Sequence, residues 1–331
     1  MLFRVSAGNQ AGLGHLARCV ALAEALDADD IDSFFLIKSD DPDGLSPFLQ
    51  NEEVIGPNFK FVPQDCDRSA DVELIKSYYK IGFSFLVLDH YEHDFAYQQE
   101  LKNAGIRWAQ FDYQAKERIL ADIVINGNIA ASGNDYIKVT EKHTKQCVGH
   151  QFAIVRQEFI NQVSSPEKRK ILIAMGGGTY PKEVLELIQF LISKKDFDYE
   201  LVSRDGRLTD VVGNFSNARL HLDSREVVSI YKKSEVAIVS GGVTTYELAA
   251  LGIPMIIVPF ASNQVPNAKA WEKHNFAMSF DNPIAFRKAV DHINFSDLLT
   301  ELKQKCALKA ITIDGLGASR IADTIRNAIS I

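Results

Sequence analysis

His15 is the side chain in this sequence best placed to act as a base. It ends the segment Gly8-Asn9-Gln10-Ala11-Gly12-Leu13-Gly14-His15, which follows the first apolar run and opens a helical pattern. Glycines there let the backbone approach a ligand closely, and the amides of a helix start favour an anion. The positive end of the helix dipole favours the neutral imidazole, the form that a base needs. A capping or solvent-facing histidine fits the sequence equally well.

Polar side chains also follow the apolar run at residues 85–88. The segment Asp89-His90-Tyr91-Glu92-His93-Asp94 combines two histidines with three carboxylates, as a metal site would. A metal site needs further ligands, and no second Asp/His cluster supplies them, so we predict none. We expect Asp89, His90 and Tyr91 to shape a polar pocket. In the alternative interpretation, Asp89 only fixes the loop and residues 92–94 start the next helix.

Two more glycine-rich loops, at residues 175–180 and 240–247, each connect a strand to a helix. A pair of such loops at one sheet edge suits a diphosphate, and Gly176 and Gly177 belong to the first of them. In the second loop we expect backbone amides and hydroxyls to bind the ligand, from Gly242, Val243, Thr244 and Thr245. Glu247 is a candidate to accept both ribose hydroxyls, although an acid in the first turn of a helix also stabilises the helix dipole.

Asn263 and Gln264 open a later helical pattern, after the apolar run at 255–258. Their amides suit sugar hydroxyls. The competing interpretation is that Asn263 is an ordinary N-cap.

The elements that must position these residues alternate between short apolar runs and helical patterns. The expected strands cover residues 2–5, 34–37, 85–88, 106–111, 123–125, 171–175, 199–202, 236–239 and 255–258. Alternation of this kind predicts doubly wound parallel sheets, and nearly continuous apolar runs indicate strands covered on both faces. The fold class is therefore α/β.

A polar segment with a proline, residues 161–169, predicts a linker between two Rossmann-like domains. We expect a catalytic N-terminal domain at 1–160 and a nucleotide-binding C-terminal domain at 168–331, with the last helix as a candidate to pack back on the first domain. Two such domains facing across a cleft would bind ligands at the carboxyl ends of their strands.

Composition excludes several classes of protein. The 331 residues include 36 Lys and Arg against 43 Asp and Glu, a net charge of −7, which disfavours nucleic-acid and anionic-membrane partners. The four cysteines lie far apart in the sequence and form no CxxC pair, so we predict neither disulfides nor a zinc site. We expect their thiols to be kept reduced in a cytoplasm. The first residues do not resemble a signal peptide, and no apolar run is long enough to span a bilayer.

The segment Gly241-Gly242-Val243-Thr244-Thr245-Tyr246-Glu247-Leu248-Ala249-Ala250-Leu251-Gly252-Ile253-Pro254 resembles the UDP-binding motif of GT-B nucleotide-sugar proteins such as MurG. The whole chain resembles the PseG family more closely, which hydrolyses UDP-2,4-diacetamido-2,4,6-trideoxy-β-L-altropyranose. The resemblance rests on Gly12-Leu13-Gly14-His15 with Arg18-Cys19, Leu88-Asp89-His90-Tyr91, Val148-Gly149, Arg156-Gln157-Glu158-Phe159, Met175-Gly176-Gly177, Asn263-Gln264 and Asp314-Gly315-Leu316-Gly317-Ala318-Ser319-Arg320.

This resemblance implies a GT-B fold and a UDP-sugar hydrolase of pseudaminic acid biosynthesis and flagellin glycosylation. Water would attack the anomeric carbon with His15 as the base, Arg18 would join the substrate site, and no metal or cofactor would be needed. We expect a monomer whose partner is the UDP-activated diacetamido sugar. A GT-B glycosyltransferase and a non-catalytic sugar-nucleotide-binding protein are the alternatives. The chain departs from the family pattern at Ser6-Ala7, Tyr113 and Thr179-Tyr180, which bears on the sugar it takes.

Overall fold

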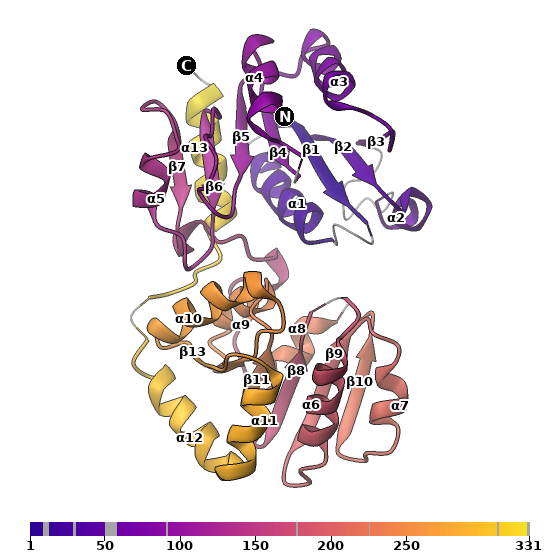
Figure 1. Ribbon diagram of the computed structural model, residues 1–331, viewed down its shortest axis with the longest axis vertical. Coiled ribbons are helices and arrows are strands. Elements are labelled where there is room, and N and C mark those ends of the chain that lie inside the picture. Colours follow the sequence, from indigo (N-terminus) through magenta and orange to yellow (C-terminus); the bar gives the residue numbers. More distant parts are fainter. Residues whose placement is uncertain are drawn as a thin grey trace. The chain divides into compact units, whose positions relative to one another are not determined.

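The computed structural model describes residues 1–8, 13–28, 31–49, 58–90, 92–176, 178–224, 226–309 and 311–329 (Figure 1). It divides into two compact units. The first unit contains Met1–Arg156 and Gly315–Ile331, and the second contains Gln157–Asp314. Gly12, Tyr91 and Gly177, which belong to the predicted site, lie outside the described residues.

The first unit contains a seven-stranded parallel sheet in the order β3-β2-β1-β4-β5-β6-β7. Its strands are β1 (Leu2–Ala7), β2 (Phe34–Ser39), β3 (Phe59–Val62), β4 (Leu86–Asp89), β5 (Trp108–Phe111), β6 (Ile123–Asn126) and β7 (Lys145–Val148). Its helices are α1 (Gly14–Asp27), α2 (Pro42–Leu49), α3 (Arg68–Lys80), α4 (Phe95–Asn103), α5 (Gly133–Ile137), the 3-10 turn η1 (His150–Phe152) and α13 (Gly317–Ile329).

Side chains of the first sheet are buried on both faces. In β1, Phe3 and Val5 belong to one apolar cluster, while Leu2 belongs to another. Successive side chains of a strand point to opposite faces, so both faces of the sheet are covered and the strand carries an almost continuous apolar run. Arg4 is the buried exception, and its guanidinium donates to the Asp71 carboxylate at 2.9 Å.

Helix α13, drawn in yellow in Figure 1, returns from the far end of the sequence to the first unit. It packs against α1, and Ile321 and Ile325 share an apolar cluster with Leu16. Gly317 begins the helix where a Cβ atom would stand 2.1 Å from the Ala153 carbonyl oxygen, so only glycine permits this approach.

The second unit contains a six-stranded parallel sheet in the order β10-β9-β8-β11-β12-β13. Its strands are β8 (Lys170–Ala174), β9 (Asp198–Ser203), β10 (Ala218–Leu222), β11 (Val236–Val239), β12 (Met255–Ile257) and β13 (Ala277–Ser279). Its helices are η2 (Gln157–Phe159), α6 (Lys182–Ile192), α7 (Leu208–Val212), α8 (Val227–Lys232), α9 (Thr244–Ala250), η3 (Ser262–Gln264), α10 (Val265–Lys273), α11 (Pro283–His292) and α12 (Phe295–Cys306).

All nine predicted strands are present, and they belong to the two parallel sheets. Four strands were not predicted, and they are the edge strands of the two sheets: β3, β7, β10 and β13. An edge strand carries more polar residues, so the apolar signal is weak, as in Ala-Arg-Leu-His-Leu of β10.

The segment at 161–169 belongs to the second unit in the structure, because the division falls between Arg156 and Gln157. The Ser165 amide donates to the Lys232 carbonyl at 2.9 Å, and the Glu167 amide donates to the Lys233 carbonyl at 2.8 Å. These bonds tie the expected linker to the end of α8. Across the described ranges, no helix combines the length and the apolar character that crossing a membrane requires.

Candidate active site

Both sheets reverse their strand order at one point, between β1 and β4 in the first unit and between β8 and β11 in the second. Loops that leave the carboxyl ends of these neighbouring strands run in opposite directions, which opens a crevice where doubly wound sheets bind ligands. In the first unit, His15 follows β1 in the chain and Asp89 ends β4. The loops after β8 and β11 carry the two glycine-rich segments of the second unit.

A short contact joins the two predicted polar segments of the first unit. His15 lies in the first turn of α1, and Asp89 ends β4. The His15 Nδ1 atom is 2.6 Å from Asp89 Oδ1, and both side chains are buried. A carboxylate only accepts hydrogen bonds, so Nδ1 carries the proton of the neutral ring and Nε2 carries the lone pair. This tautomer gives His15 a basic nitrogen and a fixed orientation.

Arg18 completes the surroundings of Asp89. Its Nε donates to Asp89 Oδ2 at 2.5 Å, its terminal nitrogen donates to Oδ1, and the Cys19 thiol donates to Oδ2 at 3.5 Å. Burial by itself would raise the pKa of the Asp89 carboxyl, but the Arg18 charge and the His15 hydrogen bond outweigh it and lower that pKa. Asp89 therefore stays ionised and holds the histidine in place.

Two aromatic rings at the end of β5 contact Arg18. The Arg18 guanidinium carbon lies 4.4 Å from the centre of the Phe111 ring and 4.8 Å from that of Tyr113. The Tyr113 hydroxyl is 3.5 Å from His15 Nδ1, and the two rings meet edge to face. The spacing of residues in the sequence could not predict the contacts of Tyr113, because 98 positions separate it from His15.

His90 is buried next to the site and has a different role from Asp89. Its Nδ1 accepts the Glu92 amide at 3.1 Å, so Nε2 carries the proton, and within the described ranges that Nε2 has no hydrogen-bond partner. Burial, and next the charge of Arg4, lower the pKa of His90 well below its usual value. The ring is thus a neutral packing element, with its edge against Tyr97.

Glu92, His93 and Asp94 serve the local structure. Asp94 is the N-cap of α4, where its side chain accepts the Tyr97 amide at 2.8 Å. Glu92 forms an ion pair with Lys38 at 3.1 Å. His93 packs edge to face on His90. Among the residues that the structure describes, no group of three or more His, Cys, Asp or Glu side chains could hold a metal ion.

The first glycine-rich loop of the second unit is anchored by Tyr180. Gly176 has a φ of 107°, a conformation that favours glycine, and its carbonyl accepts the Tyr180 hydroxyl at 2.8 Å. The buried Asp205 accepts the Tyr180 amide at 2.8 Å and forms an ion pair with Arg207 at 2.6 Å. Because of the Arg207 hydrogen bonds, the pKa of Asp205 lies below its usual value. This network fixes Gly176 while leaving its backbone exposed.

The second loop of this unit has two exposed residues between buried ones. Ser240 and Gly241 are buried, Gly242 and Val243 are exposed, and α9 begins at Thr244. Thr245 is fully buried, and its hydroxyl donates to the Gly242 carbonyl at 2.7 Å. In the structure this hydroxyl closes the first turn of α9, whereas the sequence predicted that it binds the ligand. Glu247 lies in the first turn of α9 with only 4% of its surface exposed.

Asn263 and Gln264 lie in η3, the 3-10 turn before α10. Asn263 is exposed, and it is not the N-cap of α10, a position that Gln264 occupies. The Gln264 side-chain oxygen accepts the Phe260 amide at 3.0 Å and the Ala261 amide at 3.3 Å. Part of its hydrogen-bonding capacity thus shapes the loop after β12.

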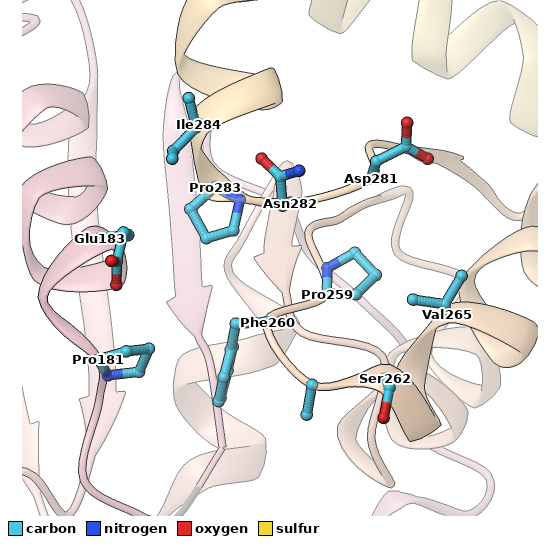
Figure 2. A pocket seen from close by; sticks show the side chains of 11 residues that line it. Pro181, Glu183, Pro259, Phe260, Ser262, Val265, Asp281, Asn282, Pro283 and Ile284 are labelled. Atoms are coloured by element: carbon cyan, nitrogen blue, oxygen red, sulfur yellow. The ribbon is translucent and has the colours of Figure 1, made fainter.

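A pocket of about 430 Å³ lies beside this loop (Figure 2). Its walls are mainly apolar, and Figure 2 shows Pro181, Pro259, Pro283 and Phe260 among the side chains that line it, together with the acidic Glu183. None of the predicted site residues lines it. It is a separate feature of the second unit.

The two doubly wound α/β units define a GT-B fold, and solved structures confirm this class. S. aureus MnaA in a co-structure with UDP is 11% identical, with 99% of this chain and 96% of that chain covered and a TM-score of 0.69. Acinetobacter baumannii MurG is 15% identical, with 98% of this chain and 99% of that chain covered and a TM-score of 0.63. Residues 159–305 match the family model of the glycosyltransferase family 28 C-terminal domain.

Sequence relatives confirm the resemblance to the PseG hydrolases. The UDP-2,4-diacetamido-2,4,6-trideoxy-beta-L-altropyranose hydrolase of Campylobacter jejuni is 22% identical over 286 residues, 85% of this chain and 98% of that protein. The Helicobacter pylori pseudaminic acid cytidylyltransferase and hydrolase is 26% identical over 263 residues, 79% of this chain and 44% of that protein. An uncharacterized Methanocaldococcus jannaschii protein is 23% identical over 267 residues, 75% of this chain and 53% of that protein. The chain thus matches about half the length of the last two.

Proposed function

We propose that this protein is a hydrolase that releases UDP and 2,4-diacetamido-2,4,6-trideoxy-L-altrose from the UDP-activated sugar. The observation that carries the proposal is the buried contact of 2.6 Å between His15 Nδ1 and Asp89 Oδ1. It orients a histidine for general-base catalysis in a fold whose relatives are named for reactions of UDP-sugars.

In the proposed reaction, His15 Nε2 accepts a proton from water as the water oxygen bonds to the anomeric carbon. The bond between that carbon and the diphosphate oxygen breaks, and its electron pair leaves with UDP. Asp89 stabilises the imidazolium that forms, as a buried carboxylate does in other base-orienting pairs. Since the diphosphate is already a good leaving group, the reaction needs no strong general acid.

The second unit would bind the nucleotide. Gly176, Gly242 and Val243 are exposed, and their amides are the proposed donors to the diphosphate. At Gly242 a Cβ atom would meet nothing within 4 Å, so a ligand has room to approach its backbone. Glu247 is the proposed acceptor for the ribose hydroxyls. The proposal also assigns Asn263 and Gln264 to the sugar, and it requires neither a metal nor a cofactor.

A glycosyltransferase is the second candidate. It is favoured by the match of residues 159–305 to a glycosyltransferase family model and by the likeness to MurG. The two functions share the donor and differ in the acceptor, which is water in one case and an alcohol in the other.

Release of UDP without an added acceptor tests the proposal. The purified protein is incubated with UDP-2,4-diacetamido-2,4,6-trideoxy-β-L-altropyranose, with UDP-N-acetylglucosamine as the comparison sugar, and UDP is quantified over time. We expect steady release from the altropyranose that is lost in His15→Asn. Release that begins only when an acceptor alcohol is added would establish the transferase instead, and UDP binding without turnover would refute both.

A further inference from the structure

Tyr113 follows β5, and its loop is held in one conformation. The preceding Asp112 accepts the amides of Gln114 at 3.0 Å and Ala115 at 2.8 Å through the same carboxylate oxygen, Oδ2. That oxygen also accepts the Tyr136 hydroxyl at 2.6 Å, which itself accepts from the Asn126 side chain at 2.8 Å. A side chain carried by such an anchored turn is preorganised, so its contacts with Arg18 and His15 do not depend on a flexible loop.

The aromatic ring and the hydroxyl of Tyr113 touch the His15–Asp89–Arg18 group in different ways. The ring centre is 4.8 Å from the Arg18 guanidinium carbon, well inside the range in which an aromatic face attracts a cation. The hydroxyl is 3.5 Å from His15 Nδ1, whose proton already goes to Asp89 at 2.6 Å. A hydrogen bond weakens strongly at that distance, so the ring supplies the stronger contact.

We propose that Tyr113 is a positioning residue of the hydrolytic site, whose ring, together with that of Phe111, holds the Arg18 guanidinium against Asp89 and thereby keeps His15 in its base-competent orientation. This inference rests on the proposed function, because it assigns His15 the role of the base. Tyr113 is also one of the positions at which the sequence departs from the family pattern.

The effect on catalysis follows from the position of Arg18. Its terminal nitrogen donates to Asp89 Oδ1, the same oxygen that lies 2.6 Å from His15 Nδ1. When the Tyr113 ring is lost, Arg18 spends part of its time away from this position. The Asp89 carboxylate can then turn, and the His15 ring loses its fixed orientation and tautomer for part of the time.

Two variants separate the ring from the hydroxyl. Tyr113→Phe keeps the ring and removes the hydroxyl, while Tyr113→Leu removes both. Arg18→Gln, alone and combined with Tyr113→Leu, tests whether the ring acts through Arg18. Phe190→Leu is the matched control in the second unit, because the Phe190 ring also contacts cations, Lys194 Nζ at 4.6 Å and the Arg287 guanidinium carbon at 5.2 Å.

We expect Tyr113→Leu to lower kcat/KM by roughly two- to thirtyfold, mostly through kcat. Tyr113→Phe and Phe190→Leu should match the wild type, and Tyr113→Leu should add nothing to Arg18→Gln. A loss in Tyr113→Phe equal to that in Tyr113→Leu, or full additivity with Arg18→Gln, overturns the proposal.

A second measurement is independent of turnover. Ring ¹⁵N NMR signals of His15, assigned by their loss in His15→Asn, report its tautomer in the full chain. We expect the Nδ1–H tautomer in the wild type and a mixture of both tautomers in Tyr113→Leu. An unchanged tautomer in Tyr113→Leu refutes the positioning role even if the protein releases no UDP, whereas absent turnover with a mixed tautomer refutes only the proposed function.

Discussion

Replacing Asp89 by asparagine removes the charge at the centre of the site with almost no change in volume. In the wild type this carboxylate accepts from His15, Arg18 and Cys19. An asparagine has one accepting oxygen and one NH2 group, so one of these donors must face another donor. The His15 ring then loses either its orientation or the tautomer that leaves the lone pair on Nε2.

The expected cost is larger in catalysis than in stability. Loss of a correctly positioned base typically lowers the rate by about 10²–10⁴, or roughly 3–5 kcal/mol in the activation free energy. Breaking a fully buried ion pair destabilises by about 3–5 kcal/mol, but the Arg18 side chain is 22% exposed and can turn toward water. We therefore expect a loss of about 1–3 kcal/mol in the free energy of unfolding, which leaves a typical domain folded.

The assay is UDP release from the altropyranose substrate at a temperature well below the melting point of each variant. Asp94→Asn is the control. Asp94 caps α4 at the other end of the same segment and forms an exposed ion pair with Arg68 at 2.6 Å. Asparagine caps a helix as well as aspartate does, so this variant should keep its rate and nearly all its stability.

The structure assigns a definite order to these results. Asp89→Asn should fall at least a hundredfold below the wild type in kcat, whereas Asp94→Asn should not. If Asp89→Asn kept more than about a tenth of the wild-type rate while folded, the 2.6 Å contact would not orient the base, and the proposed role of His15 would lose its physical basis.

Four further predictions follow from the same structure. His15→Asn should bind UDP nearly as well as the wild type in calorimetry but lose about 10²–10⁴ in hydrolysis, and near-wild-type turnover would refute the assignment. Activity should survive exhaustive EDTA treatment, and loss that Mg²⁺ or Mn²⁺ restores would contradict metal-independent hydrolysis. Glu247→Ala should weaken UDP binding about tenfold to a hundredfold if it accepts the ribose hydroxyls, whereas unchanged affinity with a lower melting point would make Glu247 structural. Because burial lowers the pKa of His90 in the folded state, the unfolded chain binds the proton more readily below pH of about 6.5, so the urea midpoint should fall between pH 7.5 and pH 5. His90→Gln should reduce this fall in the urea midpoint. Burial also lowers the pKa of His93, so His93 should cause the part of the fall that remains. If the urea midpoint of His90→Gln fell as far as that of the wild type, His90 would not be the cause.

The sequence predicted the central strands of both sheets because these strands are buried on two faces. Leu86 to Asp89 of β4 and Val236 to Val239 of β11 are buried throughout, and such runs are visible without any structure. The edge strands were not predicted because an edge strand is exposed to solvent on one side. It can therefore contain charged and polar residues that interrupt the apolar run, as in Lys-Gln-Cys-Val of β7. Their place in the sheets is set by pairing with a neighbour, which local patterns do not encode.

The sequence predicted those site residues that lie at the ends of strands or at the starts of helices. Asp89 follows an apolar run and His15 opens a helix, so both positions could be named from the sequence. Their contact, and those of Arg18 with Tyr113, join residues more than 70 positions apart and arise from the order of the strands. The hydrogen bond between the Tyr180 amide and Asp205 also depends on the fold and could not be predicted from the sequence, although it fixes the first glycine-rich loop of the second unit.

The reversal points of the two sheets have the same topology but carry different chemistry. In the first unit, the strand ends bury ionisable groups in contact, His15 with Asp89 and Arg18. In the second unit, Gly176 and Gly241 both adopt a positive φ, 107° and 109°, shortly after β8 and β11 end, and Gly176 and Gly242 are exposed. A histidine held by buried charged partners suits a proton acceptor, whereas exposed glycines suit a diphosphate. This difference in residue type supports assigning the base to the first unit and the nucleotide to the second, and it explains why His15→Asn and Glu247→Ala should affect turnover and binding separately.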